Sequence, residues 1–201
     1  MSPRPGSCET EALGALRFLD DGMRAHATGL VRCGRAVSLF PAPRSDDAPE
    51  AAGACWSGVS GRAAGRLVGR GVLLDVARAT AGGGSALAVD ERRLRATVEA
   101  QGPTSTVRRG DIALVRSGGG PGAAARLSRT AREWLRQSEI AAVATDARGF
   151  ALPPDPRLPL GSLFRLDELA ADCAADHVYE FLLFAAPLPV HGAPVHPVAI
   201  K

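Results

Sequence analysis

The feature that most constrains the fold is an alternation of short apolar runs with longer segments of helical periodicity, which fills residues 67–200. The apolar runs have the length and the aliphatic, β-branched content of buried strands. They cover residues 67–76, 111–116, 140–145 and 178–185, and the terminal VHPVAIK is a further candidate. Helices are expected at residues 90–100, 122–137 and 166–175, the first of them capped by Asp90. The alternation predicts an α/β protein with mixed α+β layers, in which helices cover the sheet.

The N-terminal part has a different pattern. Leu13, Leu16, Leu19 and Met23 recur at helical spacing, so residues 9–29 are expected to form one amphipathic helix. A short strand is expected at residues 35–40. Residues 41–65 are rich in Pro, Ala, Gly, Ser and Asp without a sustained period, which predicts an irregular loop.

Length and composition indicate one domain. The chain has 201 residues, 46% of them hydrophobic, which is enough for a single core. We therefore expect one domain over residues 1–201, with an N-terminal helical part at 1–34, the loop at 41–65 and the main scaffold at 67–201.

Charge and aromatic content argue against a nucleic-acid-binding protein. Basic residues exceed acidic ones by three, and only 4% of the residues are aromatic, so stacking platforms for bases are scarce. The arginines at 92–95 and 108–109 are interleaved with Glu91, Glu99 and Asp111, which is typical of a solvated face.

No segment indicates export or a membrane. The most apolar stretch, residues 178–190, contains Glu180, Pro187 and Pro189 and is shorter than the ~20 residues of a spanning helix. The N-terminus lacks the pattern of a signal peptide. Four cysteines lie far apart without a C-x-x-C pair, which favours reduced thiols: Cys8, Cys33, Cys55 and Cys173. We expect a cytoplasmic protein without membrane or nucleic-acid partners.

Four segments, in order, resemble the bacterial cyclase family, the kynurenine formamidase-like metal-dependent hydrolases. They are GRGVLLDVAR (69–78), VRRGDIALVRSG (107–118), AREWLRQSEIAAVATD (131–146) and LDELAADCAADHVYEFLLFAAPLPVHGAPVHPVAIK (166–201). The resemblance implies a mixed β/β/α fold and a homo-oligomer. It also implies a zinc or manganese ion that activates water against an amide or ester carbonyl.

The metal motif of that family is missing. An H-x-G-T-H-x-D-x-x-x-H segment should precede GVLLDV, but GACWSGVSG (53–61) stands there, with Ser57 at the Asp position and Gly61 at that of the last His. Ser162 and Arg165 stand where the family carries a ligand Glu and an Asp. No histidine occurs between residues 27 and 176. We therefore expect no cofactor and a fold trimmed around the active site, in either a trimmed paralogue or a decayed or incompletely predicted reading frame.

The candidate catalytic residues are Cys55, Ser57 and Asp146. Cys55 and Ser57 are a thiol and a hydroxyl in the former metal segment, and His26 or His177 would have to reach them through the fold to activate them. Asp146 follows an expected strand and is a candidate general base, as is Asp75. The alternative for both carboxylates is a helix cap or a surface ion pair. His191 and His196 are either two metal ligands or polar loop residues.

Three functions are compatible with these observations. The first is a metal-independent cyclase, or a protein that binds a small aromatic or carbonyl-bearing metabolite, in bacterial secondary metabolism. Holding the reacting atoms together contributes several kcal/mol to such ring closures even without a metal. The alternative is a catalytically inactive structural or regulatory member that pairs with itself or with a paralogue. The third is a metal-dependent, arylformamidase-like amide or ester hydrolase, which needs ligands that the sequence lacks.

Overall fold

The computed structural model describes residues 13–41, 53–59, 64–80, 88–118, 126–147, 157–187 and 195–201. Its centre is an eight-stranded mixed sheet with the order β1-β10-β9-β3-β5-β7-β8-β2. Four neighbouring strands are parallel: β3 (Val68–Asp75), β5 (Ile112–Arg116), β7 (Ala142–Thr145) and β8 (Leu160–Ser162). Antiparallel strands flank them: β9 (Glu180–Phe184), β10 (Val198–Ile200) and β1 (Ala36–Ser38) on one side, and β2 (Cys55–Ser57) on the other.

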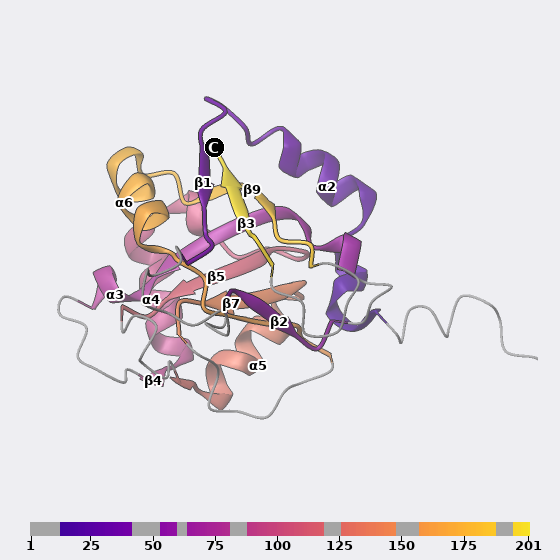
Figure 1. Ribbon diagram of the computed structural model, residues 1–201. Coiled ribbons are helices and arrows are strands. Elements are labelled where there is room, and N and C mark those ends of the chain that lie inside the picture. The colour runs from indigo at the N-terminus through magenta and orange to yellow at the C-terminus, as the bar shows by residue number, and fades with distance from the viewer. Residues whose placement is uncertain are drawn as a thin grey trace, which may run out of the picture.

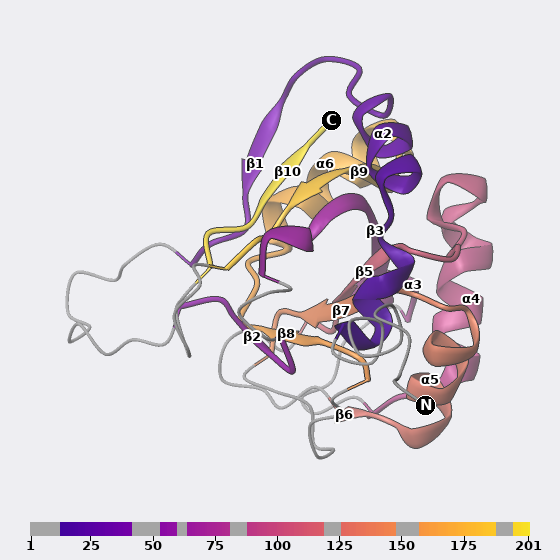
Figure 2. The ribbon, with the colours of Figure 1, turned by 90° about the vertical axis from the view of Figure 1, so that its right-hand side faces the viewer.

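Helices cover both faces of this sheet (Figures 1 and 2). α4 (Glu91–Gln101) and α5 (Arg129–Gln137) pack on one face, and α6 (Asp167–Asp176) packs on the other. α2 (Asp21–Thr28) lies against β3 and β9. The remaining elements are short: η1 (Gly14–Phe18), η2 (Ala64–Arg66), α3 (Val76–Ala79), η3 (Pro103–Ser105), and the parallel pair β4 (Ala88–Val89) and β6 (Arg126–Leu127). None of the described helices is both long and apolar enough to span a bilayer.

Two hydrophobic cores alternate along the central strands, as the period of two in a strand requires. Leu73 and Leu114 belong to the core under α6, whereas their neighbours Val72 and Val115 belong to the core under α4 and α5. All four are buried. Because both faces are covered, the central strands are mostly apolar, apart from residues such as Arg70 and Asp75 of β3, which explains why their sequences read as nearly continuous apolar runs.

The sheet curls so that its two ends approach each other. The amide of Arg165, just after β8, donates to the carbonyl of Leu39, just after β1, at 2.8 Å. The amide of Val195 donates to the carbonyl of Ala54 at 2.8 Å, which joins the chain before β10 to the chain before β2. The absence of a side chain at Gly71 lets the ring of Phe181 pack directly on β3, since a Cβ on Gly71 would lie 2.3 Å from that ring.

The expected strands at residues 67–76, 111–116, 140–145 and 178–185 are confirmed as β3, β5, β7 and β9, and the terminal candidate is β10. The helix cap at Asp90 is also confirmed, because its carboxylate accepts the amide of Arg93 at 2.8 Å. The expected α/β class with mixed layers is therefore confirmed.

Several of the element boundaries predicted from the sequence are wrong. The irregular loop at residues 41–65 contains β2, because pairing with β8 supplies hydrogen bonds that the local sequence does not signal. The helix expected from 122 begins only at Arg129, where Ser128 caps it, and residues 126–127 form β6. The single N-terminal helix is divided into η1 and α2 at Leu19 and Asp20, since Asp20 caps α2 through the amide of Met23.

Candidate active site

The carboxyl ends of the four parallel strands meet at one edge of the sheet, which is where open α/β sheets bind ligands. β3 ends at Asp75 and β5 at Arg116, while Asp146 directly follows β7. Ser162 ends β8 and lies opposite Cys55 of β2. We call these five residues the carboxyl-edge site.

Asp146 is held in place by four hydrogen bonds. Its Oδ1 accepts the amide of Ser117 at 3.0 Å, the hydroxyl of Ser117 at 2.6 Å and the hydroxyl of Thr145 at 3.1 Å. Among the described residues, its Oδ2 accepts the amide of Gly118 alone, at 3.0 Å. The half-buried carboxylate therefore ties the end of β5 to the end of β7 and keeps acceptor capacity on Oδ2. Its role as a general base stays a prediction.

Arg116 is a fixed cation at the same edge. Its Nη1 donates to Asp75 at 2.9 Å, while Nε and Nη2 lie 3.0 and 2.9 Å from Asp167. Burial lowers the pKa of Arg116, but the two carboxylates outweigh it and hold the pKa above its usual value. Within the part of the chain that the structure describes, three of the five N–H bonds of the guanidinium are used, which leaves two for a ligand oxygen.

Asp75 has a structural role. Its side chain is 1% exposed, its Oδ1 accepts the amide of Arg78 at 3.1 Å, and it caps α3. The expected alternative of a helix cap is thus confirmed for this residue.

Cys55 and Ser57 lie on one face of β2, and Trp56 points to the other, because successive residues of a strand alternate. Cys55 pairs with Ser162 and Ser57 with Leu160. Burial raises the pKa of the Cys55 thiol, so the thiol is protonated at neutral pH. The exposed Ser57 hydroxyl donates to the carbonyl of Leu160 at 3.2 Å. The structure therefore places Cys55 beside Ser162 and Ser57 beside Leu160, and β8 lies between β2 and the strand that Asp146 follows.

The histidines expected to activate these nucleophiles lie on other elements. His26 is exposed on α2, and His177 follows α6, where its carbonyl accepts the hydroxyl of Thr104 at 3.0 Å. Within the described ranges, no hydrogen bond joins either of them to Cys55 or Ser57. His196 instead contacts Ser38. Cys8, Gly61 and His191 lie outside the described residues.

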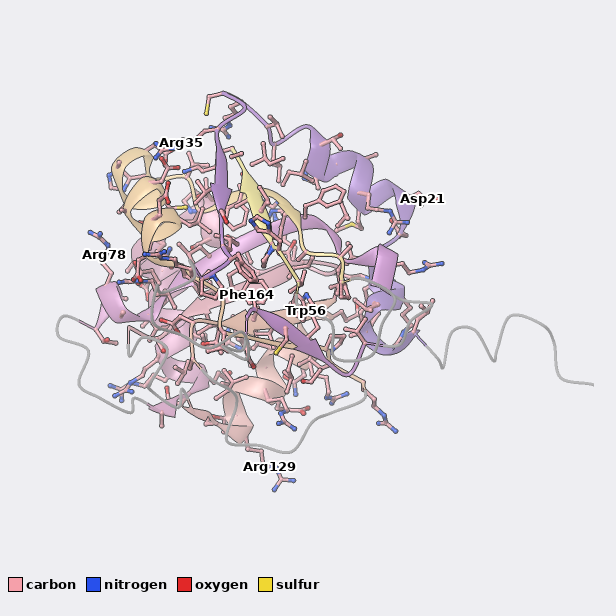
Figure 3. All side chains as sticks on the ribbon, viewed as in Figure 1. Asp21, Arg35, Trp56, Arg78, Arg129 and Phe164 are labelled. Carbon is pink, nitrogen blue, oxygen red and sulfur yellow. The ribbon has the colours of Figure 1, made fainter. Side chains whose placement is uncertain are left out.

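Sequence analysis missed β8 and the aromatic residue that follows it. The rings of Trp56 and Phe164 lie 5.3 Å apart at an angle of 75°, and both are labelled in Figure 3. The indole Nε1 of Trp56 donates to the carbonyl of Ala185 at 2.9 Å. A Cβ on Gly161 would meet both rings at 3.0 Å or less. The glycine before Ser162 was the one available signal, since it marks a close approach.

The donor set does not fit a resident divalent metal. In the part of the chain that the structure describes, no three His, Cys, Asp or Glu side chains are grouped so that they could hold a metal ion. The two segments that would supply ligands do lie side by side, but they present the Cys55 thiol and the hydroxyls of Ser57 and Ser162. One thiol and two hydroxyls do not make such a site, since zinc and manganese sites combine several imidazole, thiolate or carboxylate groups.

Three solved structures share the fold. A novel cyclase aligns with a TM-score of 0.79 and 19% identity, covering 94% of this chain and 96% of that one. Isatin hydrolase A from Labrenzia aggregata, bound to benzyl benzoate, aligns with a TM-score of 0.57 and 16% identity over 86% and 94%. A predicted metal-dependent hydrolase from Bacillus stearothermophilus aligns with a TM-score of 0.52 and 13% identity over 84% and 98%.

The curated proteins contain no match to this chain. A family model does match: the Cyclase model, described as "Putative cyclase", covers residues 46–151. This range spans β2 to β7 and more than half of the chain. The chain therefore belongs to the cyclase family.

Proposed function

We propose that this protein binds a small aromatic or carbonyl-bearing metabolite at the carboxyl-edge site and promotes its ring closure without a resident metal. The observation that carries the proposal is the pairing of Cys55 with Ser162, because it brings together the two ligand-bearing segments in a form that offers no metal ligand set. The fixed Arg116 and Asp146 supply the polar groups that such a reaction needs.

The chemistry is an intramolecular carbonyl addition. Asp146 Oδ2 takes a proton from the carbon next to a carbonyl. The N–H bonds of Arg116 that no described carboxylate uses stabilise the resulting enolate oxygen. The enolate carbon attacks a second carbonyl of the same molecule, a C–C bond forms, and the proton passes from Asp146 to the new alkoxide. No co-reactant is required. The proposal assigns this reaction to bacterial secondary metabolism in the cytoplasm, where Cys33, Cys55 and Cys173, which are all free, stay reduced.

Ligand binding to metal-free protein tests this proposal. In a Trp134→Phe background, Trp56 is the remaining tryptophan, and titration with isatin is expected to change its fluorescence with or without EDTA. Arg116→Gln is expected to weaken binding about tenfold or more, because a hydrogen bond to a charged group contributes about 1.5–3 kcal/mol. Arg95→Gln, an exposed arginine on α4, is the matched control, and thermal melts confirm folding.

Metal analysis by plasma mass spectrometry accompanies the titration. We expect substoichiometric zinc and manganese and no change of the melting temperature on chelation. Stoichiometric metal whose removal abolishes isatin binding would contradict the proposal and favour the metal-dependent amide or ester hydrolase.

A second candidate is a structural or regulatory subunit that pairs with itself or with a paralogue. It is favoured by Phe184, which is 51% exposed on β9 and lies in one row with Val68 and Val198. Exposed aromatic side chains are typical anchors of interfaces.

Light scattering behind size exclusion tests this second candidate. This candidate predicts a homo-oligomer that Phe184→Glu shifts toward the monomer, because a charge replaces the anchor. Ala171→Glu, which adds the same charge to the exposed side of α6, is expected to leave the mass unchanged. A monomeric wild-type protein would rule out self-association through this row.

A further inference from the structure

We propose that Ser38 and His196 form a nucleophile–base pair for acyl transfer from small aromatic esters. This inference goes beyond the proposed ring closure and does not rest on it, since no residue of the carboxyl-edge site takes part. The pair lies on β1 and just before β10, at the opposite end of the strand order from β2.

The two functional groups are in hydrogen-bond contact. Ser38 Oγ lies 2.8 Å from His196 Nε2, although the residues are 158 positions apart in the sequence. Both side chains are exposed, so a substrate can reach them. A serine hydroxyl becomes a competent nucleophile when a base within this distance can take its proton. The antiparallel pairing of β1 with β10 brings this contact about, because Ser38 lies opposite Val198, two residues after His196.

The edge of β1 provides donors for the developing oxyanion. The amides of Arg35 and Leu39 donate to the carbonyls of Lys201 and Pro197, so the alternate amides, those of Ser38 and Phe40, point away from β10. No described strand pairs with this side of β1 (Figure 2). The amide of Phe40 donates to Ser38 Oγ at 3.4 Å, which places this donor beside a carbonyl under attack. Backbone amides in such positions stabilise the charge of a tetrahedral intermediate.

Aromatic side chains around the pair indicate the class of substrate. The ring of Phe40 lies 5.4 Å from the ring of His196, tilted by 52°. Phe184 belongs to the same row across the sheet, because Ser38 pairs with Val198 and Val198 with Phe184. An aromatic acyl or leaving group can pack against these rings.

The reaction balances without a further reagent except water. Ser38 Oγ forms a bond to the ester carbonyl carbon while its proton passes to His196 Nε2. The intermediate expels the alcohol or phenol oxygen, which takes the proton from His196. Water then attacks the acyl-serine with His196 as the base, releases the carboxylic acid and restores Ser38.

Covalent labelling tests the pair. Full-length protein is treated with a fluorophosphonate probe, the labelled residue is located by peptide mass spectrometry, and hydrolysis of 4-nitrophenyl benzoate is followed in parallel. We expect label on Ser38, none on this site in Ser38→Ala, and about 100-fold or more slower labelling in His196→Ala. Added imidazole is expected to restore labelling of His196→Ala, which a merely structural role would not allow.

Thr28→Val and His26→Ala, both exposed on α2, are the matched controls and are expected to label as the wild type does. Labelling of Ser38 and binding of isatin are separate measurements, so failure of this proposal and failure of the ring-closure proposal are separable. Label on another residue, equal ester hydrolysis by Ser38→Ala, or no label on folded wild-type protein would overturn the inference.

Discussion

Arg70→Met is expected to lower the free energy of unfolding by about 3–5 kcal/mol, because it leaves buried carboxylates without their cation. Arg70 is 1% exposed on β3 and pairs with Asp111, which is fully buried, and with Glu180 at 2.9 Å. It also donates to the carbonyl of Thr106 at 3.1 Å. The guanidinium therefore links β3, β9 and the segments before β5 at the end of the sheet opposite the carboxyl edge.

The loss of unfolding free energy in Arg70→Met is expected to depend on pH. Burial raises the pKa of Asp111 above its usual value, although Arg70 opposes this. A carboxyl with a raised pKa in the folded state binds a proton more tightly there than in the unfolded chain, so it contributes stability as pH falls through that window. Without Arg70 the pKa of Asp111 rises further. Protonation of Asp111 then removes part of the free-energy cost of burying its unpaired charge. The deficit of Arg70→Met is therefore expected to be smaller at pH 5 than at pH 8.

Urea unfolding of wild type and variant at both pH values measures this effect. Arg95→Met serves as the control, because Arg95 and Glu91 form an exposed pair on one turn of α4, which is expected to contribute about 0.3–0.5 kcal/mol. A deficit equal to that of the control, or one that grows as pH falls, would contradict the prediction.

Phe164→Ala is expected to lower the free energy of unfolding by about 3–5 kcal/mol, the range for removing a buried phenylalanine ring. Phe164 is 1% exposed and packs edge to face against Trp56, so the variant opens a cavity at the point where β2 joins the sheet. The fluorescence of Trp56 is expected to change with it, because its aromatic neighbour is lost.

Phe184→Ala is the matched control, since it removes the same ring from a position that is 51% exposed. For a monomer in dilute solution, Phe184→Ala is expected to change the free energy of unfolding by no more than about 0.5 kcal/mol. Thermal and urea unfolding of both variants, with emission spectra in the Trp134→Phe background, provide the comparison. Equal losses in the two variants would show that the ring of Phe164 is not part of a packed core.

Local pattern predicted the central strands and the cap at Asp90 because both depend on neighbours in the sequence. A strand buried on both faces is apolar at most positions, and a cap requires only a side chain a few residues from the amide it accepts. β2 and β8 could not be predicted in the same way. Each has three residues. β2 is defined by its hydrogen bonds to β8, more than a hundred positions away, and β8 by its hydrogen bonds to β2 and to β7.

The candidate sites also divide into what the sequence predicts and what only long-range pairing brings together. The sequence alone determined that this chain carries no histidine between residues 27 and 176, and its segments pointed to the cyclase family. Only the tertiary structure decided which groups meet: Cys55 with Ser162, Arg116 with Asp75 and Asp167, and Ser38 with His196. The physical reason is that composition and period report local preference and burial, whereas strand pairing and the curl of the sheet set the distances between side chains remote in the chain.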